Sequence, residues 1–87
     1  MAWVYILRCS DGSLYVGSTQ NLAGREQAHN EGRGGRYTGR RLPVLLVYSE
    51  EHSSVGDAFK RERQLKHWTR AKKEALIDGD LAKLKRL

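Results

Sequence analysis

Arg25 and His29 are the first side chains in the sequence whose spacing could serve chemistry. They lie four residues apart in a polar stretch whose one large apolar residue is Leu22. Residues three, four and seven apart share a helical face, so both polar groups occupy the stripe where core is expected. The stretch therefore predicts a helix that borders a polar site. On residue type alone, a solvated Arg25 and an exposed His29 remain open as alternatives.

Glu62 interrupts an apolar face in the same way. Steps of three or four residues join Val55, Phe59, Glu62 and Leu65 into one helical stripe. Burying a carboxylate without a partner would cost several kcal/mol. Glu62 should therefore have a partner, and the sequence leaves two open: a metal ion, or a neighbouring lysine or arginine.

Tyr5 and Tyr15 stand on either side of a turn signal at residues 10–12. A three-residue loop with Gly12 in the left-handed conformation would place Tyr5 opposite Gly17. The two tyrosines then share a face, and Gly17 leaves space beside the Tyr5 ring. A two-residue turn would separate the tyrosines and leave them as ordinary strand residues. In the first register the opposite face is apolar and is formed by Val4, Ile6, Leu14 and Val16.

Two short helices and a small sheet are expected to position these groups. Apolar runs predict strands at 2–9, 14–18 and 44–48. Capping residues predict helices that begin after Asn21, after Ser53 or Ser54, and after Thr69. The glycine-rich residues 32–43 predict a mobile loop. The expected fold is α+β, in the order β-β-α-β-α-α, with a three-stranded, mainly antiparallel sheet flanked by helices.

Composition limits the partners and the compartment. The 87 residues fit a single domain, 1–87, with a core over about 2–77 and a short basic helical tail at 78–87. Sixteen lysines and arginines against ten acidic residues give a net charge of +6, which favours nucleic acid, although solubility alone would also explain it. Cys9 is the single cysteine, which excludes an intramolecular disulfide and indicates the cytoplasm. The apolar start ends at Arg8, too early for a membrane span.

Several motifs, taken in order, resemble the GIY-YIG nuclease superfamily. Trp3, Val4 and Tyr5, followed by Tyr15, Val16 and Gly17, are similar to its paired signature. The resemblance covers residues 3–77 and is greatest to small stand-alone bacterial members, which consist of the nuclease domain and mostly lack an assigned function. It continues through Asn21, Leu22, Arg25, His29, Tyr37, Thr38, Ala58 and Glu62.

The resemblance implies a metal-dependent DNA endonuclease that hydrolyses phosphodiester bonds, with a place in DNA repair or recombination. Arg25 would contact the scissile phosphate, because a guanidinium donates two hydrogen bonds and keeps its charge. Glu62 would be the single protein ligand of Mg²⁺ or Mn²⁺. Tyr5 or a metal-bound water would help to deprotonate the nucleophile, Tyr15 would orient phosphate or water, and His29 would position water or move a proton. A catalytic Tyr5 needs nearby cations to lower its pKa from about 10.

The glycine-rich loop carries Tyr37 among several arginines, which predicts capture of a nucleic-acid strand. Tyr37 would stack on a base or, at the site-lining position implied by the resemblance, take part in the chemistry. Of the later basic residues, Lys66 alone shares the Glu62 side. A solvated loop is the alternative. The expected nucleic-acid-binding residues are Arg33, Arg36, Tyr37, Arg40, Arg41 and Lys66.

Two features depart from the pattern that the resemblance implies. Trp3 and Val4 stand where the signature has glycine and isoleucine, and no asparagine follows Asn30. No DNA-recognition domain is expected beside the nuclease domain, so the substrate should be selected by DNA structure, single-stranded or branched, or through a protein partner. The alternative function is a non-catalytic nucleic-acid-binding module, or an adaptor, that keeps the nuclease fold.

Overall fold

A three-stranded antiparallel sheet forms the centre of the computed structural model, which describes all residues, 1–87. Its strands are β1 (Ala2–Arg8), β2 (Leu14–Thr19) and β3 (Leu45–His52), and β1 lies in the middle. The predicted sheet is therefore confirmed. β3 extends four residues beyond the predicted end at residue 48, because it pairs with β1 as far as Ala2 opposite His52.

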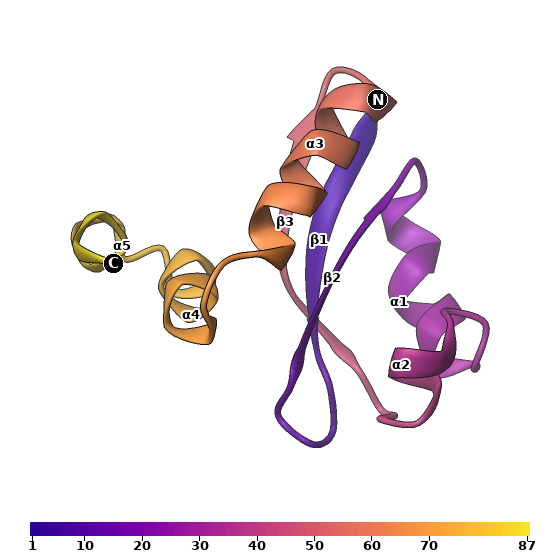
Figure 1. Cartoon of the computed structure of the whole chain (residues 1–87). Helices are drawn as coiled ribbons and strands as arrows, with labels where there is room; N and C mark the ends of the chain where they lie inside the picture. The colour runs from indigo at the N-terminus through magenta and orange to yellow at the C-terminus, as the bar shows by residue number, and fades with distance from the viewer.

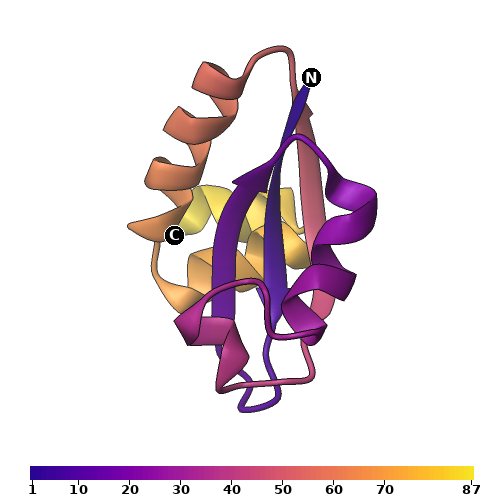
Figure 2. The same cartoon turned by 90° about the vertical axis from the view of Figure 1, so that its right-hand side faces the viewer.

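Helices cover both faces of this sheet. They are α1 (Leu22–Asn30), α2 (Arg36–Gly39), α3 (Val55–Lys66), α4 (Arg70–Asp78) and α5 (Leu81–Arg86). Figure 1 shows α3 on one face of the sheet and α1 with α2 on the other, and Figure 2 shows α1 and α2 in front of the strands with α4 and α5 behind them. The predicted α+β class and its order are confirmed, with the short α2 added. None of the five helices is long and apolar enough to cross a bilayer.

The side chains of β1 alternate between two core layers, as the pleat of a strand requires. Val4 and Ile6 pack with Val16 under α3, as predicted. Tyr5 and Leu7 point to the other face, where α1 lies. The sheet thus separates an apolar layer from a layer that contains the polar site.

The predicted hairpin register is also confirmed. Tyr5 lies opposite Gly17, and the Cys9 amide donates to the Ser13 carbonyl oxygen over 2.9 Å. Gly12 has a φ of 84°, a left-handed conformation that favours glycine. The three-residue turn therefore sets which side chains of β2 face Tyr5.

Two of the predicted helix starts have the expected caps. Ser54 Oγ accepts the Asp57 amide, and Thr69 Oγ1 accepts the Lys72 amide. Asn21 is the N-cap residue of α1, as predicted, but its side chain makes no capping hydrogen bond. Its own amide instead donates to Thr19 Oγ1 over 3.0 Å, which fixes the turn out of β2.

The predicted apolar stripe of α3, formed by Val55, Ala58, Phe59 and Leu65, is confirmed for two of these residues and wrong for the other two. Val55 and Phe59 are 54% and 52% exposed, whereas Ala58 and Leu65 are the buried residues of the helix. Ala58 and Leu65 lie seven residues apart and so share a face. The small Ala58 side chain lets the helix pack closely on the sheet, and Phe59 is thereby turned outward.

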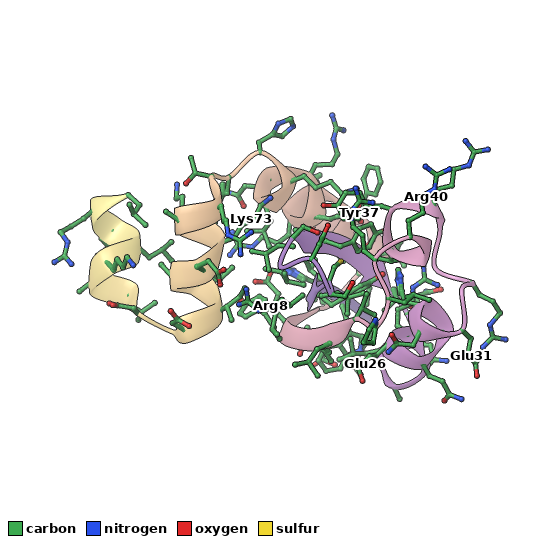
Figure 3. The ribbon with its side chains drawn as sticks, turned by 90° about the horizontal axis from the view of Figure 1, so that it is seen from below. Arg8, Glu26, Glu31, Tyr37, Arg40 and Lys73 are labelled. Carbon is green, nitrogen blue, oxygen red and sulfur yellow. The ribbon has the colours of Figure 1, made fainter.

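Two contacts between distant segments attach α4 and α1 to the sheet. Arg8 at the end of β1 makes a bidentate ion pair with Glu74 of α4, over 2.7 and 2.9 Å (Figure 3). On the other face, Glu26 of α1 accepts a hydrogen bond from the Leu46 amide of β3. These contacts tie one helix on each face to the sheet.

Candidate active site

The Tyr5 hydroxyl is the centre of a polar cluster between β1 and α1. Arg25 Nε donates to it over 3.1 Å, and His29 Nε2 lies 3.0 Å from it. The three residues come from the predicted hairpin and the predicted helical stripe. The structure therefore brings together groups that are up to 24 residues apart in the chain.

Gly17 makes room for this hydroxyl. A Cβ atom at Gly17 would lie 2.5 Å from the Tyr5 oxygen and 3.1 Å from the Tyr15 ring, so any larger residue would displace one of them. The Tyr5 and Tyr15 ring centroids are 6.4 Å apart. The predicted shared face and the predicted space beside Tyr5 are both present.

His29 is buried, contrary to the exposure that its residue type alone would suggest. Its Nδ1 lies 2.7 Å from Thr38 Oγ1, so both ring nitrogens contact protein groups. Burial and, second, the charge of Arg25 lower the pKa of His29, which keeps the imidazole neutral. A neutral ring donates through one nitrogen and accepts through the other. Tyr5, His29 and Thr38 therefore form a buried hydrogen-bonded chain.

Thr38 attaches the glycine-rich segment to α1 through its contact with His29. It lies on α2 and is fully buried against His29, so the predicted loop at 32–43 contains a short helix and is anchored. Gly34 passes so close to His29 that a Cβ there would lie 1.9 Å from Nδ1. The glycines of this segment thus serve close packing as well as turning, and the prediction that the segment holds no regular element is wrong because α2 lies within it.

Burial changes the expected acidity of Tyr5. Desolvation raises the pKa of Tyr5 above 10.0 and outweighs the hydrogen bond and charge of Arg25, which lower it. Of the two cations expected to lower the pKa of Tyr5, Arg25 and the metal ion, Arg25 by itself does not outweigh the effect of burial. In return, the hydrogen bond to Tyr5 raises the pKa of Arg25. Arg25 stays charged and Tyr5 stays protonated at neutral pH.

Glu62 reaches the same region from α3. Its side chain is 12% exposed, and it pairs with Lys66 Nζ over 2.6 Å. It also accepts a hydrogen bond from Ser18 of β2 over 2.5 Å. Its charge contributes to raising the pKa of Tyr5, which lies on the neighbouring strand. The predicted need for a partner is confirmed, and in this structure the partner is the cation of Lys66.

The four arginines of the glycine-rich segment fall into two groups. Arg41 covers the Tyr37 ring at 3.9 Å from its centroid and pairs with Asp11 over 3.0 Å. Arg33 pairs with Glu31. Arg36 and Arg40 have no ion-pair partner, and Figure 3 shows Arg40 pointing away from the protein. Arg36, the first residue of α2, and Arg40, which directly follows α2, are thus the two arginines of this segment without an acidic partner.

Tyr37 lies between the hairpin and α2. Its ring stacks on Tyr15 with centroids 6.0 Å apart, at an interplanar angle of 29°. It is still 41% exposed. The structure thus places Tyr37 at the border of the tyrosine cluster, as a wall of the site that faces solvent.

Sequence reasoning missed the supporting roles of three residues. Asn30 accepts the Val44 amide over 2.7 Å and donates to the Val44 carbonyl oxygen over 3.0 Å, which fixes the return into β3. Ser18 holds Glu62, and Thr38 holds His29. Ser18 directly follows Gly17 and so could have been suspected, but the partner of Asn30 is set only by the tertiary fold.

The chemistry of Glu62 fits a hydrated divalent ion. No three His, Cys, Asp or Glu residues gather into a cage, so an ion at Glu62 would take its other ligands from water and substrate. Magnesium accepts such sites because it keeps several waters. None of the larger surface hollows is lined by Tyr15, Arg25 or Glu62, so the site is shallow and open to a large substrate.

The arrangement of two hairpin tyrosines, a helical arginine and a glutamate from a later helix defines a nuclease-type domain. The family described as "GIY-YIG catalytic domain" matches residues 1–75, and the chain belongs to this family. It is 48% identical over 75 residues to UPF0213 proteins of Staphylococcus aureus, strains Mu3 and N315, covering 86% of this chain and 92% of theirs. It is also similar to the solution NMR structure of a UPF0213 protein from Bacillus halodurans, with a TM-score of 0.58 and 40% identity over 90% of this chain and 84% of that one.

Proposed function

We propose that the protein is a divalent-metal-dependent endonuclease that hydrolyses phosphodiester bonds in DNA and selects its substrate by DNA structure. This proposal is supported above all by the way in which the Arg25 guanidinium is held. Its Nε is held by the Tyr5 hydroxyl, whereas its terminal nitrogens make no hydrogen bond with the protein. An anchored guanidinium with free terminal donors is suited to bind a phosphate.

Tyr5 and His29 act as positioning residues in this proposal. Both are buried, and the raised pKa of Tyr5 disfavours a tyrosinate base at neutral pH. The chain from Thr38 through His29 to Tyr5 instead fixes the direction of Arg25. A preorganised donor stabilises the developing charge without reorganising during the reaction. Of the two expected routes for deprotonating the nucleophile, Tyr5 or a metal-bound water, this proposal therefore does not use Tyr5.

Tyr15 and Glu62 complete the site. The Tyr15 hydroxyl makes no hydrogen bond with the protein and is free to orient a phosphate or a water. Glu62 would hold the metal ion, which when bound supplies positive charge against the phosphate. In the reaction, a water oxygen bonds to phosphorus and gives up one proton to solvent, one phosphorus–oxygen ester bond breaks, and the leaving oxygen takes up a proton from solvent. Lys66, beside Glu62, would contribute a further positive charge toward the DNA backbone.

A cleavage assay tests the proposal. Plasmid and oligonucleotide substrates are incubated with Mg²⁺ or Mn²⁺, and the wild type is compared with Glu62→Gln. Glu51→Gln is the matched control, because Glu51 is an exposed carboxylate on β3 without an ion-pair partner. We expect Glu62→Gln to lose cleavage and Glu51→Gln to keep it. Cleavage that persists in Glu62→Gln, or without any divalent ion, would contradict the proposal.

The ion pair between Lys66 and Glu62 favours a second candidate, a non-catalytic nucleic-acid-binding module. In that case the lysine would satisfy the carboxylate permanently, and no metal ion would be needed. This alternative predicts DNA binding that is unaffected by chelators, with no cleavage under any metal condition. The same assay, run beside a binding measurement with and without chelator, distinguishes the two functions.

A further inference from the structure

The orientation of α3 is fixed by one contact on each side of the helix. Arg61 Nε donates to Glu50 of β3 over 3.0 Å, whereas Glu62 accepts from Ser18 of β2. β2 is one of the two edge strands, so the Glu62 side of α3 lies toward the β2 edge of the sheet. At about 100° per residue, Phe59 lies roughly 60° from Glu62 and 160° from Arg61 around the helix. Phe59 therefore faces the β2 edge of the sheet, on the same side of α3 as Glu62.

Phe59 is an exposed aromatic residue in a positively charged setting. It is 52% exposed, and Lys66 lies almost in line with it two turns further along the helix. The Arg63 guanidinium is 5.9 Å from the ring centroid, at the outer limit of a cation–π contact. Single exposed apolar residues are common on protein surfaces. Phe59 differs because Arg63 lies against its ring and because it stands on the side of α3 that carries Glu62.

The contrast with Tyr37 decides which ring is free to accept a ligand. Tyr37 already stacks on Tyr15 and is covered by Arg41 at 3.9 Å. Phe59 has no aromatic partner, and its one cation lies 2.0 Å further out, at 5.9 Å against 3.9 Å. Tyr37, which was expected to stack on a base, is thus already in contact with protein groups, whereas Phe59 offers an open ring face.

We infer that Phe59 is a stacking platform for an unpaired base next to the cleaved phosphate, so that the preferred substrate is DNA with a single-stranded flap beside a duplex. This inference rests on the proposed function and specifies its substrate. In a duplex the base faces are covered by neighbouring bases, whereas an unpaired base can stack on an aromatic ring. Arg63 beside the ring, and Lys66 two turns further along the helix, supply charge for the adjoining backbone.

Binding without metal tests the inference, because it does not depend on cleavage. The probes are a fluorescently labelled duplex and the same duplex with a single-stranded flap that carries 2-aminopurine at its first unpaired position. Anisotropy in the presence of chelator gives the two dissociation constants, and the 2-aminopurine emission reports stacking. We expect the wild type to prefer the flap and to quench the probe. Phe59→Ala should weaken flap binding about tenfold and leave duplex binding unchanged.

Three further variants make the test specific. Phe59→Tyr keeps an aromatic face and should behave as the wild type, whereas Phe59→Leu keeps apolar area alone and should behave as Phe59→Ala. Leu81→Ala removes an even more exposed apolar side chain, from α5, and should change nothing. A preference for the flap that survives in Phe59→Ala, or full retention in Phe59→Leu, would overturn the inference. Equal binding of flap and duplex by the wild type would also overturn it.

The two proposals fail in different ways. If Glu62→Gln still cleaves DNA, the proposed function is wrong while the flap preference stands or falls on the Phe59 variants. If Phe59→Ala keeps the flap preference while Glu62→Gln is inactive, the stacking platform is wrong and the nuclease remains.

Discussion

Tyr5 accepts a hydrogen bond from Arg25 Nε, so a buried phenol on the central strand holds an arginine at the surface. The phenol is fixed in turn by His29 on the same helix as Arg25. This geometry means that Tyr5 influences the reaction through the direction of a guanidinium. The following predictions examine that chain and the surfaces around it.

The Arg25→Lys variant tests whether the positive charge of Arg25 is sufficient or whether the shape of its guanidinium is also required. Lysine keeps a positive charge but has no Nε to bind Tyr5 and no planar fork to bind phosphate. We expect the cleavage rate to fall about 10²- to 10³-fold, the cost of losing one positioned donor. Single-turnover cleavage measures the loss, and thermal unfolding checks that the fold persists. Arg86→Lys, at an exposed position on α5, is the control and should leave both unchanged.

Gly17→Ala should displace Tyr5. The added methyl would lie 2.5 Å from the Tyr5 hydroxyl, so the ring or the strand must move. We expect the free energy of unfolding to fall by about 1–3 kcal/mol and cleavage to fall with it. Gly39→Ala is the matched control, because nothing lies within 4 Å of a Cβ there. Equal effects of the two substitutions in urea unfolding would refute the steric role of Gly17.

His29 should make the protein less stable in mild acid. Its folded pKa is lowered below 6.5, so the unfolded chain takes up a proton at a higher pH than the folded chain does. The contribution is fully present above pH 6.5 and is lost as pH falls through the folded pKa. Urea unfolding at a series of pH values, compared between wild type and His29→Gln, isolates this contribution. Parallel pH profiles for the two proteins would show that His29 is not the source.

Asn30→Ala should destabilise the connection between α1 and β3. Its side chain makes both backbone hydrogen bonds of the buried Val44, which would lose their partners. We expect a loss of about 1–3 kcal/mol in the free energy of unfolding. Asn21→Ala, which removes an exposed asparagine without a side-chain capping bond, should cost less than about 0.5 kcal/mol. Denaturant midpoints measure both losses. An Asn30→Ala variant that unfolds at the wild-type midpoint would contradict a stabilising role for the two Asn30–Val44 hydrogen bonds.

DNA binding should weaken steeply between about 50 and 200 mM salt, because cations displaced from phosphates are released on binding. Arg36→Ala and Arg40→Ala should each reduce the slope of log affinity against log salt by about one. Arg41→Ala should act differently, since Arg41 pairs with Asp11 and covers Tyr37. Its main effect should be on unfolding. Identical slopes for all three variants would contradict this division of the arginines.

Local rules were sufficient for much of the fold and part of the site. The Gly12 turn and the alternation of β1 determine the pairing of Tyr5 with Gly17, and both can be recognised within a short segment. The shared face of Arg25 and His29 likewise follows from helical spacing. These predictions depend on neighbours in the chain, which the sequence displays directly.

The features that escaped prediction depend on contacts between distant segments. His29 is buried because α2 places Thr38 against it, and nothing in α1 indicates this. The pKa of Tyr5 rises because the packed layers exclude water, an effect that outweighs the visible arginine. The rotation of α3 exposes Phe59 because Ala58 is the better fit to the sheet. Periodicity gave the helix but not which of its faces is buried.

The contact of Glu26 with β3 bears on how molecules of this protein meet one another. β3 lies at a border of the sheet, where free amides can recruit a strand from another chain and start aggregation. The Leu46 amide is already bonded to the Glu26 carboxylate, close to the irregularity in the pairing of β3 with β1. Further along the strand, Glu51 adds an exposed negative charge. The two acidic side chains therefore oppose fibril-like growth from the β3 border of the sheet.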